Sequence, residues 1–156
     1  MVSIEITNEQ DALRFDEDRL KQGAESVLRD AGIVAGSLSI AVVDDPAIHA
    51  LNRKYLAHDC PTDVLSFTLE RDGRRLEGEV VASAETAARA AEQFGWAAED
   101  ELLLYVLHGT LHLVGYDDAT DELRLAMRAA ERRYLAAFGL VLREEPSAET
   151  DRSTPR

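Results

Sequence analysis

A single segment, AAEDELLLYVLHGTLHLVG at residues 97–115, sets the strongest limit on the fold. Its length suits a helix, yet apolar side chains would fall on nearly every face of that helix. A helix that is apolar all round is stable only when it is buried. We therefore expect this helix to run through the core, with the other elements packed around it.

Segments with the patterns of strands and of amphipathic helices make up the rest of the chain. We expect strands at residues 2–7, 37–45, 63–70 and 76–83. We expect further helices at residues 15–32, 46–56, 84–95 and 118–139. These elements predict an α/β (α+β) fold, a mixed sheet of about four strands packed with helices, in one compact domain over residues 1–143. Residues 144–156 are polar, contain Pro and Ser, and predict a disordered C-terminal tail.

The composition limits where the protein works and what it binds. Cys60 is the only cysteine, which excludes an internal disulfide and suits a reducing cytoplasm. The N-terminal residues have no basic region followed by an apolar stretch, so we expect no signal peptide. No run of about 18 apolar residues predicts a membrane span. The formal net charge of −13 argues against non-specific nucleic-acid binding, which requires clustered Lys and Arg.

The stretch HGTLHLVGYDD, residues 108–118, carries the side chains best suited to chemistry. His108 and His112 are four residues apart, so both imidazoles would lie on one face of the helix and could bind one ion. Gly115 lets the chain leave the helix with a positive φ, and the next turn can return Asp118 to that face. This is the ligand spacing of the metzincin-type zinc helix, with Asp in the third position. We expect His108, His112 and Asp118 to bind one metal ion in a zincin-like domain.

Two histidines at this spacing also occur without a metal, as ordinary core or surface residues. The surroundings favour a metal here, because leucine and valine side chains between Leu102 and Val114 surround the pair. A polar ring buried there without a partner costs about 1–3 kcal/mol. A shared metal ion would be that partner. His49 and His58 match no ligand position, and we assign them no role.

Three blocks of the sequence resemble the YbeY family of bacterial rRNA-maturation endoribonucleases. HGTLHLVGYDD resembles the family signature His-Gly-x-Leu-His-Leu-x-Gly-Tyr-Asp-His. LNRKYLAHDCPTDVLSF, residues 51–67, resembles the family block Leu-Asn-x-x-Tyr-Arg followed by Pro-Thr-Asp-Val-Leu-Ser-Phe. GEVVASAET, residues 78–86, resembles Gly-Asp-Ile-x-Ile-Ser-x-Glu-Thr. The blocks occur in the family's order and span nearly all of the expected domain.

The resemblance implies a zinc-dependent single-strand endoribonuclease, a hydrolase in which a metal-activated water attacks a phosphodiester. It implies one zinc ion at the signature's ligand positions, beside a cleft in a compact α/β fold. It also implies a role in 16S rRNA 3′-end maturation and ribosome quality control. The implied partners are rRNA and the small ribosomal subunit, with ribosomal protein and GTPase partners, in the cytoplasm.

The third ligand position departs from the family, which usually has His where this chain has Asp118. A carboxylate is a competent zinc ligand, but it is shorter than imidazole and carries a negative charge. The bound water should be less acidified, and another divalent metal could be preferred over zinc. Asp117 is the alternative ligand, and the spacing favours Asp118 over it.

A second departure is Leu56, which stands where the family has Arg. An Arg beside the metal would bind the scissile phosphate or the charge that develops on it, and Leu56 cannot. Arg53 and Lys54, about one turn earlier, could bind RNA in its place, although Lys lacks the bidentate geometry of Arg. The alternative for Arg53 and Lys54 is an ordinary solvated helix face.

Two clusters of arginines could answer the charge objection to RNA binding. Arg124, Arg128 and Arg132 form a stripe at helical spacing, with Arg133 beside it, and the expected hairpin carries Arg71, Arg74 and Arg75. Acidic residues, namely Asp121, Glu122 and Glu131, lie among the arginines of the stripe. This pattern favours an ion-paired helix surface over an RNA-binding patch.

Three functions therefore stay open, led by the metal-dependent endoribonuclease. A ribosome-associated binding module with a structural metal and little nuclease activity is favoured by the loss of Arg at position 56. A metalloprotease shares the ligand spacing, but Gly109 stands where HExxH proteases carry their catalytic Glu. For the same reason the general base is unassigned.

Overall fold

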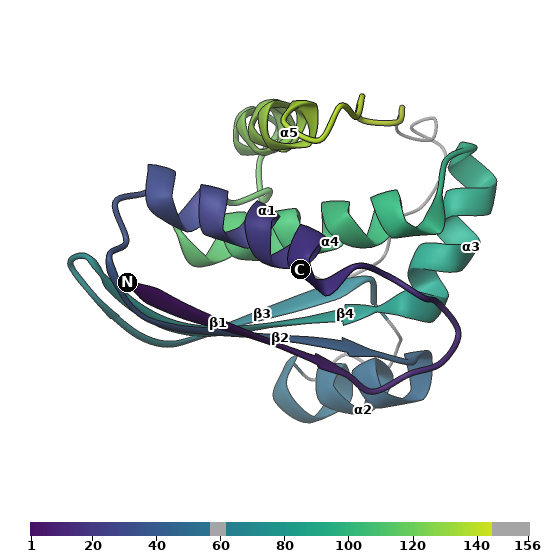
Figure 1. Ribbon diagram of the computed structural model, residues 1–156, viewed down its shortest axis with the longest axis horizontal. Coiled ribbons are helices and arrows are strands. Elements are labelled where there is room, and N and C mark those ends of the chain that lie inside the picture. The colour runs from purple at the N-terminus through teal and green to yellow at the C-terminus, as the bar shows by residue number, and fades with distance from the viewer. Residues whose placement is uncertain (57–61, 145–156) are drawn as a thin grey trace.

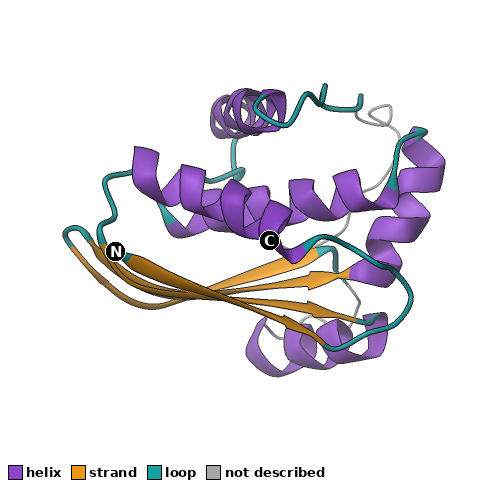
Figure 2. Cartoon of the chain, in the orientation of Figure 1, coloured by secondary structure: helices purple, strands orange, loops and turns teal. Residues whose placement is uncertain are grey.

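Residues 1–56 and 62–144 are described by the computed structural model, and they contain every strand and helix expected from the sequence (Figure 2). In chain order the elements are β1 (Val2–Asn8), α1 (Glu17–Asp30), β2 (Ala35–Val43), α2 (Asp45–Leu56), β3 (Val64–Asp72), β4 (Arg75–Ser83), α3 (Ala84–Phe94), α4 (Ala98–Leu113) and α5 (Asp121–Ala136). The expected α+β fold class is confirmed. None of the helices among these residues has the length and apolar character needed to cross a membrane.

The four strands form one mixed sheet in the order β1-β2-β4-β3. β2 pairs parallel with both β1 and β4, whereas β3 and β4 form an antiparallel hairpin closed by Gly73 with φ of 57°. β3 is therefore an edge strand. Its position matters because the candidate site lies against it.

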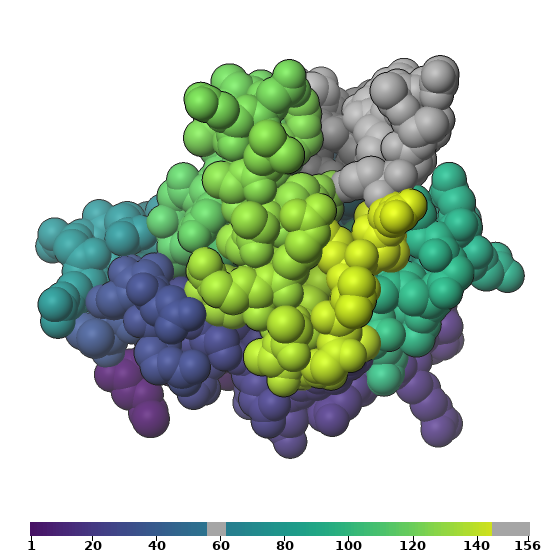
Figure 3. Space-filling view, turned by 90° about the horizontal axis from the view of Figure 1, so that it is seen from above, coloured from purple at the N-terminus to yellow at the C-terminus, as the bar shows by residue number. Residues whose placement is uncertain are grey.

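Helices cover both faces of the sheet, as Figure 1 shows. α1 and α4 lie on one face, and α5 crosses above α4. α2 lies on the opposite face, over a small second core made by Val43, Ile48, Leu65 and Val81. Seen from above, α5 and the chain that follows it cover much of this side of the molecule (Figure 3).

α4 is the central helix that the sequence predicts. Every residue from Glu101 to Leu111 is buried, including five leucines with at most 2% of their surface exposed. The main core cluster joins α4 to the inner faces of the sheet and to α1, α3 and α5. The two histidines therefore lie on a helix that the core encloses over most of its length.

α4 approaches the sheet most closely at Gly109. A Cβ atom added at Gly109 would lie 2.8 Å from Val80 Cγ1 and 3.1 Å from Val64 Cγ2. Such distances are well below ordinary carbon–carbon contact. A glycine is therefore required for the helix to lie this close to β3 and β4.

Asp45, the first residue of α2, ties this helix to the start of α3. Its carboxylate accepts hydrogen bonds from Ser83 Oγ at 2.6 Å, Thr86 Oγ1 at 2.7 Å and Arg89 NH1 at 2.7 Å. Ser83 Oγ also caps α3 by accepting the Thr86 N–H at 3.1 Å. Burial raises the pKa of Asp45, but these three donors and the Arg89 charge outweigh burial, so its pKa lies below the ordinary value.

The chain after α5 is held against the domain by a buried ion pair. Arg143 makes two hydrogen bonds to Glu101, Nε to Oε1 at 2.9 Å and NH2 to Oε2 at 2.8 Å. Its guanidinium lies 3.8 Å from the ring centre of Phe94, and Trp96 Nε1 donates to Glu101 Oε1 at 2.7 Å. Arg143 thus packs as part of the domain. The expected disordered tail at 144–156 lies, apart from Glu144, outside the described residues.

Candidate metal centre

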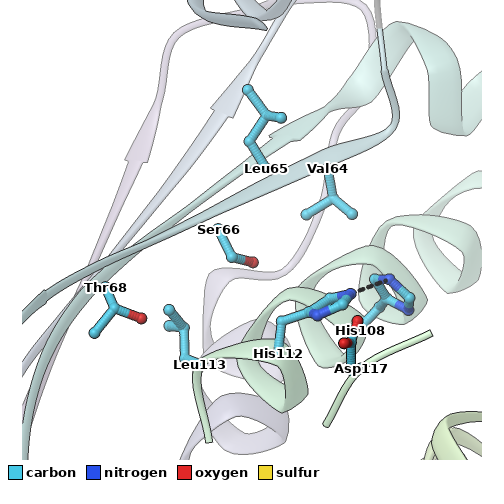
Figure 4. A pocket seen from close by; sticks show the side chains of 8 residues that line it. All are labelled: Val64, Leu65, Ser66, Thr68, His108, His112, Leu113 and Asp117. Atoms are coloured by element: carbon cyan, nitrogen blue, oxygen red, sulfur yellow. Dashed lines mark hydrogen bonds between the residues drawn. The ribbon is translucent and has the colours of Figure 1, made fainter. Parts of the chain in front are cut away.

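His108 and His112 lie one turn apart on α4, and their ring nitrogens converge. The two Nε2 atoms are 3.1 Å apart, and the ring centres are 4.6 Å apart in an edge-on arrangement. Only 8% of the His108 side chain and 20% of the His112 side chain are exposed. Helical spacing predicts this convergence, and the structure shows it (Figure 4).

The turn after α4 brings Asp118 back to the histidines. Gly115 has φ of 109°, and the N–H groups of Gly115 and Tyr116 bond back to carbonyls of the last helical turn. The chain then reverses, and Asp118 Oδ2 lies 3.6 Å from His108 Nε2 and 3.8 Å from His112 Nε2. The expected return of Asp118 to this face of the helix is thus observed.

The three side chains fit a divalent metal ion. One ligand atom from each of His108, His112 and Asp118 lies within 4.8 Å of the other two. In a tetrahedral site with bonds of about 2.0–2.1 Å, ligand atoms are roughly 3.3 Å apart. The observed separations of 3.1, 3.6 and 3.8 Å need only small side-chain adjustments to reach that value. Two imidazoles and one carboxylate suit zinc and similar ions, and three protein ligands leave a position open, as in catalytic sites.

Asp117 has a different place from Asp118. Its Oδ1 accepts the backbone N–H of Asp118 at 2.7 Å, and its side chain lines the pocket beside the histidines. Among the described residues, the group that could hold a metal ion contains Asp118 and not Asp117. The geometry therefore agrees with the choice made from spacing, and metal binding by Asp118 stays a prediction.

The sequence placed Glu131 on an ion-paired helix surface, but the structure buries it behind His108. Glu131 on α5 has no exposed surface, and its Oε2 lies 2.7 Å from His108 Nδ1. Arg128 NH1 donates to the other oxygen, Oε1, at 2.7 Å. One local signal could have predicted this burial. Glu131 lies next to Ala130 and three residues before Tyr134, on the face of α5 that is buried.

The carboxylate of Glu131 is held in its charged form. Burial raises its pKa, but the hydrogen bond and charge of His108 and those of Arg128 outweigh burial, so the pKa lies below the ordinary value. A charged carboxylate only accepts hydrogen bonds, so the His108 Nδ1–H is the donor. When His108 is neutral, as a metal ligand must be, its lone pair is then on Nε2, the nitrogen that faces His112 and Asp118.

Two members of the candidate metal centre, His108 and His112, line a pocket of about 270 Å³. Figure 4 shows the histidines and Asp117 facing the side chains of the edge strand β3. The lining residues are Val64, Leu65, Ser66, Thr68, His108, His112, Leu113 and Asp117. In the part of the chain that the structure describes, no Arg or Lys lines this pocket. Apart from the two histidines, its lining is apolar or hydroxylic, and the formal charge in it comes from Asp117.

Arg53 and Lys54, the expected RNA-binding residues, lie in the last turn of α2, outside the pocket lining. Both are exposed, and the Lys54 ammonium lies 5.1 Å from the ring centre of Tyr55. α2 covers the face of the sheet opposite α4 (Figure 1). RNA binding by Arg53 and Lys54 stays a prediction, without support from proximity to the metal ligands. Leu56 ends α2; its side chain and His58 lie outside the described structure.

Ion pairs are found in both arginine clusters. For the stripe the sequence favoured an ion-paired helix surface, but its acidic partner Glu131 is buried. Arg124 pairs with Asp121, and Arg128 pairs with the buried Glu131. In the hairpin, Arg75 pairs with Glu77 at 2.6 Å. One member of the stripe on α5, Arg128, is therefore hydrogen-bonded to the carboxylate that contacts His108.

Comparison with known proteins agrees with the geometry. The sequence model of the family described as "Endoribonuclease YbeY" matches residues 5–139. Endoribonuclease YbeY of Rhodopirellula baltica is 44% identical over 138 residues, covering 87% of this chain and 70% of the relative. Endoribonuclease YbeY of Carboxydothermus hydrogenoformans is 42% identical over 140 residues, covering 87% of this chain and 97% of the relative.

A solved structure supports the same assignment at the level of the fold. The solution structure of TM1509 from Thermotoga maritima superposes with a TM-score of 0.58 and 25% sequence identity. The match covers 89% of this chain and 92% of that one. Together with the family match over most of the domain, these similarities lead to one conclusion: the chain belongs to the endoribonuclease YbeY family.

Proposed function

We propose that this protein is a metal-dependent endoribonuclease that cleaves single-stranded RNA. The observation that carries the proposal is the convergence of His108, His112 and Asp118, with both histidines lining a pocket. Membership of a family named for endoribonuclease activity supplies the reaction class. The family resemblance further suggests 16S rRNA 3′-end maturation and ribosome quality control as the process, and the small ribosomal subunit as the partner.

Each side chain of the site has a part in this proposal. His108, His112 and Asp118 hold the cation, with zinc as the first candidate and a harder divalent ion as the second. A divalent cation held there supplies Lewis-acid stabilisation of charge on the phosphoryl group and activation of water. The pocket beside β3 receives the RNA strand, and the enclosing leucine and valine side chains limit access of bulk water to the ligands.

The absence of a Glu after the first histidine argues against a metalloprotease. HExxH enzymes use that Glu as a general base. Here the position is Gly109, and an added Cβ would lie 2.8 Å from Val80 Cγ1. The packing of α4 on the sheet therefore leaves no room for the protease's catalytic side chain.

A binding module with a structural metal is the second candidate, and the acidic pocket favours it. Cleavage of a phosphodiester needs positive charge near the phosphoryl oxygens, and cationic side chains usually contribute to it. Among the described residues no Arg or Lys lines the pocket. The protein would then bind its ribosomal partner and cleave RNA slowly.

The deciding experiment measures metal content and RNA cleavage for the same purified variants. The wild-type protein should carry one metal ion by elemental analysis and cleave a single-stranded RNA. Asp118→Ala should lose both properties, and Asp121→Ala, an exposed aspartate in the next turn, should keep both. Asp117→Ala should keep its metal. Retention of metal by Asp118→Ala and its loss in Asp117→Ala would reverse the ligand assignment.

Two further arms separate the candidate functions. Leu56→Arg should raise RNA cleavage by restoring the family's cation. A wild-type protein that carries metal but cleaves RNA only after Leu56→Arg would make the binding module the better description. Cleavage of casein without cleavage of RNA would establish a protease instead.

A further inference from the structure

Glu131 contacts a metal-ligand candidate from a different helix. It lies on α5 with no exposed surface, and Oε2 is 2.7 Å from Nδ1 of His108 on α4. Its second oxygen, Oε1, is 2.7 Å from Arg128 NH1, and 16% of the Arg128 side chain is exposed. The three side chains form the chain Arg128–Glu131–His108, which ends at the candidate metal centre.

We propose that Glu131 is a positioning residue that fixes the tautomer and the ring orientation of His108 for metal binding, and that Arg128 orients Glu131. The inference rests on the proposed function, because a metal ion is what the Nε2 lone pair of His108 would bind. A ligating histidine commonly donates its other ring N–H to a carboxylate, which makes the metal-facing nitrogen a better ligand. The 2.7 Å contact places a carboxylate at that position.

A purely structural ion pair is the alternative, and this protein contains one for comparison. Glu101 also has no exposed surface and is held by an arginine, with NH2 of Arg143 2.8 Å from Oε2. Glu101 is hydrogen-bonded to Arg143 and Trp96, not to a histidine of the site, among the residues that the structure describes. Glu101→Gln is therefore a matched control, with similar burial and similar loss of charge.

Replacing Glu131 by Gln gives a sharper test than removing its side chain with Glu131→Ala. Arg128 only donates hydrogen bonds, so it attracts the single oxygen of the Gln amide. The amide NH₂ then faces His108 Nδ1, which has to accept a hydrogen bond. His108 would shift to the tautomer with a proton on Nε2, where the metal lone pair should be. Adding Arg128→Leu removes the competing donor and lets the Gln oxygen turn toward His108.

The experiment measures zinc affinity by competition with a chromophoric chelator, together with thermal unfolding of each metal-free protein. Glu131→Gln and Glu131→Ala should bind zinc about 10- to 100-fold more weakly than wild type. Glu101→Gln should lower the unfolding temperature but leave zinc affinity unchanged. Arg128→Leu/Glu131→Gln should regain part of the affinity lost in Glu131→Gln. Nitrogen-15 NMR of the metal-free proteins reports the tautomer of neutral His108. The ring proton should be on Nδ1 in the wild type and on Nε2 in Glu131→Gln.

Each outcome has a separate meaning. A folded Glu131→Gln protein with wild-type zinc affinity would overturn the inference alone, and so would an equal loss of affinity in Glu101→Gln. If Glu131→Ala fails to fold, the Gln variant and its Arg128→Leu partner decide the question. A wild-type protein that binds no divalent metal would overturn the proposed function and this inference with it.

Discussion

The hydroxyl of Ser66 on β3 donates a hydrogen bond to the backbone carbonyl of Gly109 on α4, with 2.9 Å between Oγ and the carbonyl oxygen. Gly109 directly follows His108, so this bond attaches the helical turn that carries the candidate metal ligand His108 to the edge strand. The absence of a side chain at Gly109 permits the close approach. One contact thus links the packing of the core helix to the geometry of the candidate site.

Gly109→Ala should destabilise the protein because its Cβ would meet Val80 Cγ1 at 2.8 Å. Overpacking costs about 1–3 kcal/mol, and the better helix propensity of Ala returns up to about 1 kcal/mol. We expect a net loss of about 1–2 kcal/mol in the free energy of unfolding, measured by urea denaturation. Gly23→Ala on α1 is the control, since its Cβ would meet only flexible leucine ends at 3.1 and 3.2 Å. Equal effects of the two changes would contradict the packing argument.

Removing Arg143 should destabilise the domain far more than removing an exposed arginine. Arg143→Ala leaves Glu101 buried without its ion-pair partner, which costs about 3–5 kcal/mol. Arg124→Ala, which breaks the exposed pair with Asp121, should cost less than about 1 kcal/mol. Chemical denaturation of both variants measures the difference. Similar values for the two would show that the Arg143–Glu101 pair adds little.

Asp45 should make the stability of the protein depend on pH in the acidic range. Its pKa is lower in the folded state than in the unfolded chain, so its contribution is present above the unfolded pKa. That contribution is lost as the pH falls through the folded pKa. We expect Asp45→Asn to be less stable than wild type at neutral pH and the gap to close below about pH 4.

Urea denaturation between neutral and acidic pH measures this gap. Asp121→Asn, at a carboxylate paired with Arg124 but with 94% of its side chain exposed, should lose less stability at neutral pH than Asp45→Asn. A gap for Asp45→Asn that widens on acidification would contradict the direction of the pKa shift.

Asp118→His should shift metal preference toward zinc. Imidazole suits zinc, whereas carboxylate oxygens suit harder ions such as Mn²⁺. Competition of Zn²⁺ and Mn²⁺ against one chelator should give a higher zinc-to-manganese affinity ratio in Asp118→His than in wild type. Asp117→His, next to the ligand, should leave the ratio near the wild-type value. A lower ratio in Asp118→His would argue that Asp118 is not a ligand.

The sequence predicted the elements well because their signals are local. The apolar run of α4, the capping serine before α3 and the glycine-containing hairpin each act within a few residues. The expected helix at 118–139 started too early, since Thr120 is its N-cap, with Oγ1 accepting the Leu123 N–H at 3.1 Å. Asp118 then belongs to the turn, which is what frees it to face the histidines.

The candidate metal centre could be predicted for the same reason, but the contact between Glu131 and His108 could not. His108, His112 and Asp118 come from one helix and its following turn, so spacing alone could place them together. Glu131 reaches His108 only through the crossing of α5 over α4, which no local pattern specifies. The pocket likewise depends on β3 being an edge strand, and the hairpin signal does not say which of its two strands joins the rest of the sheet.

The most direct test of the metal-centre proposal is a crystal of the wild-type protein grown with zinc and measured at the zinc absorption edge. We expect one anomalous peak within about 2.0–2.2 Å of His108 Nε2, His112 Nε2 and Asp118 Oδ2. A map with no peak between these three atoms, or with zinc bound only elsewhere, would contradict the account.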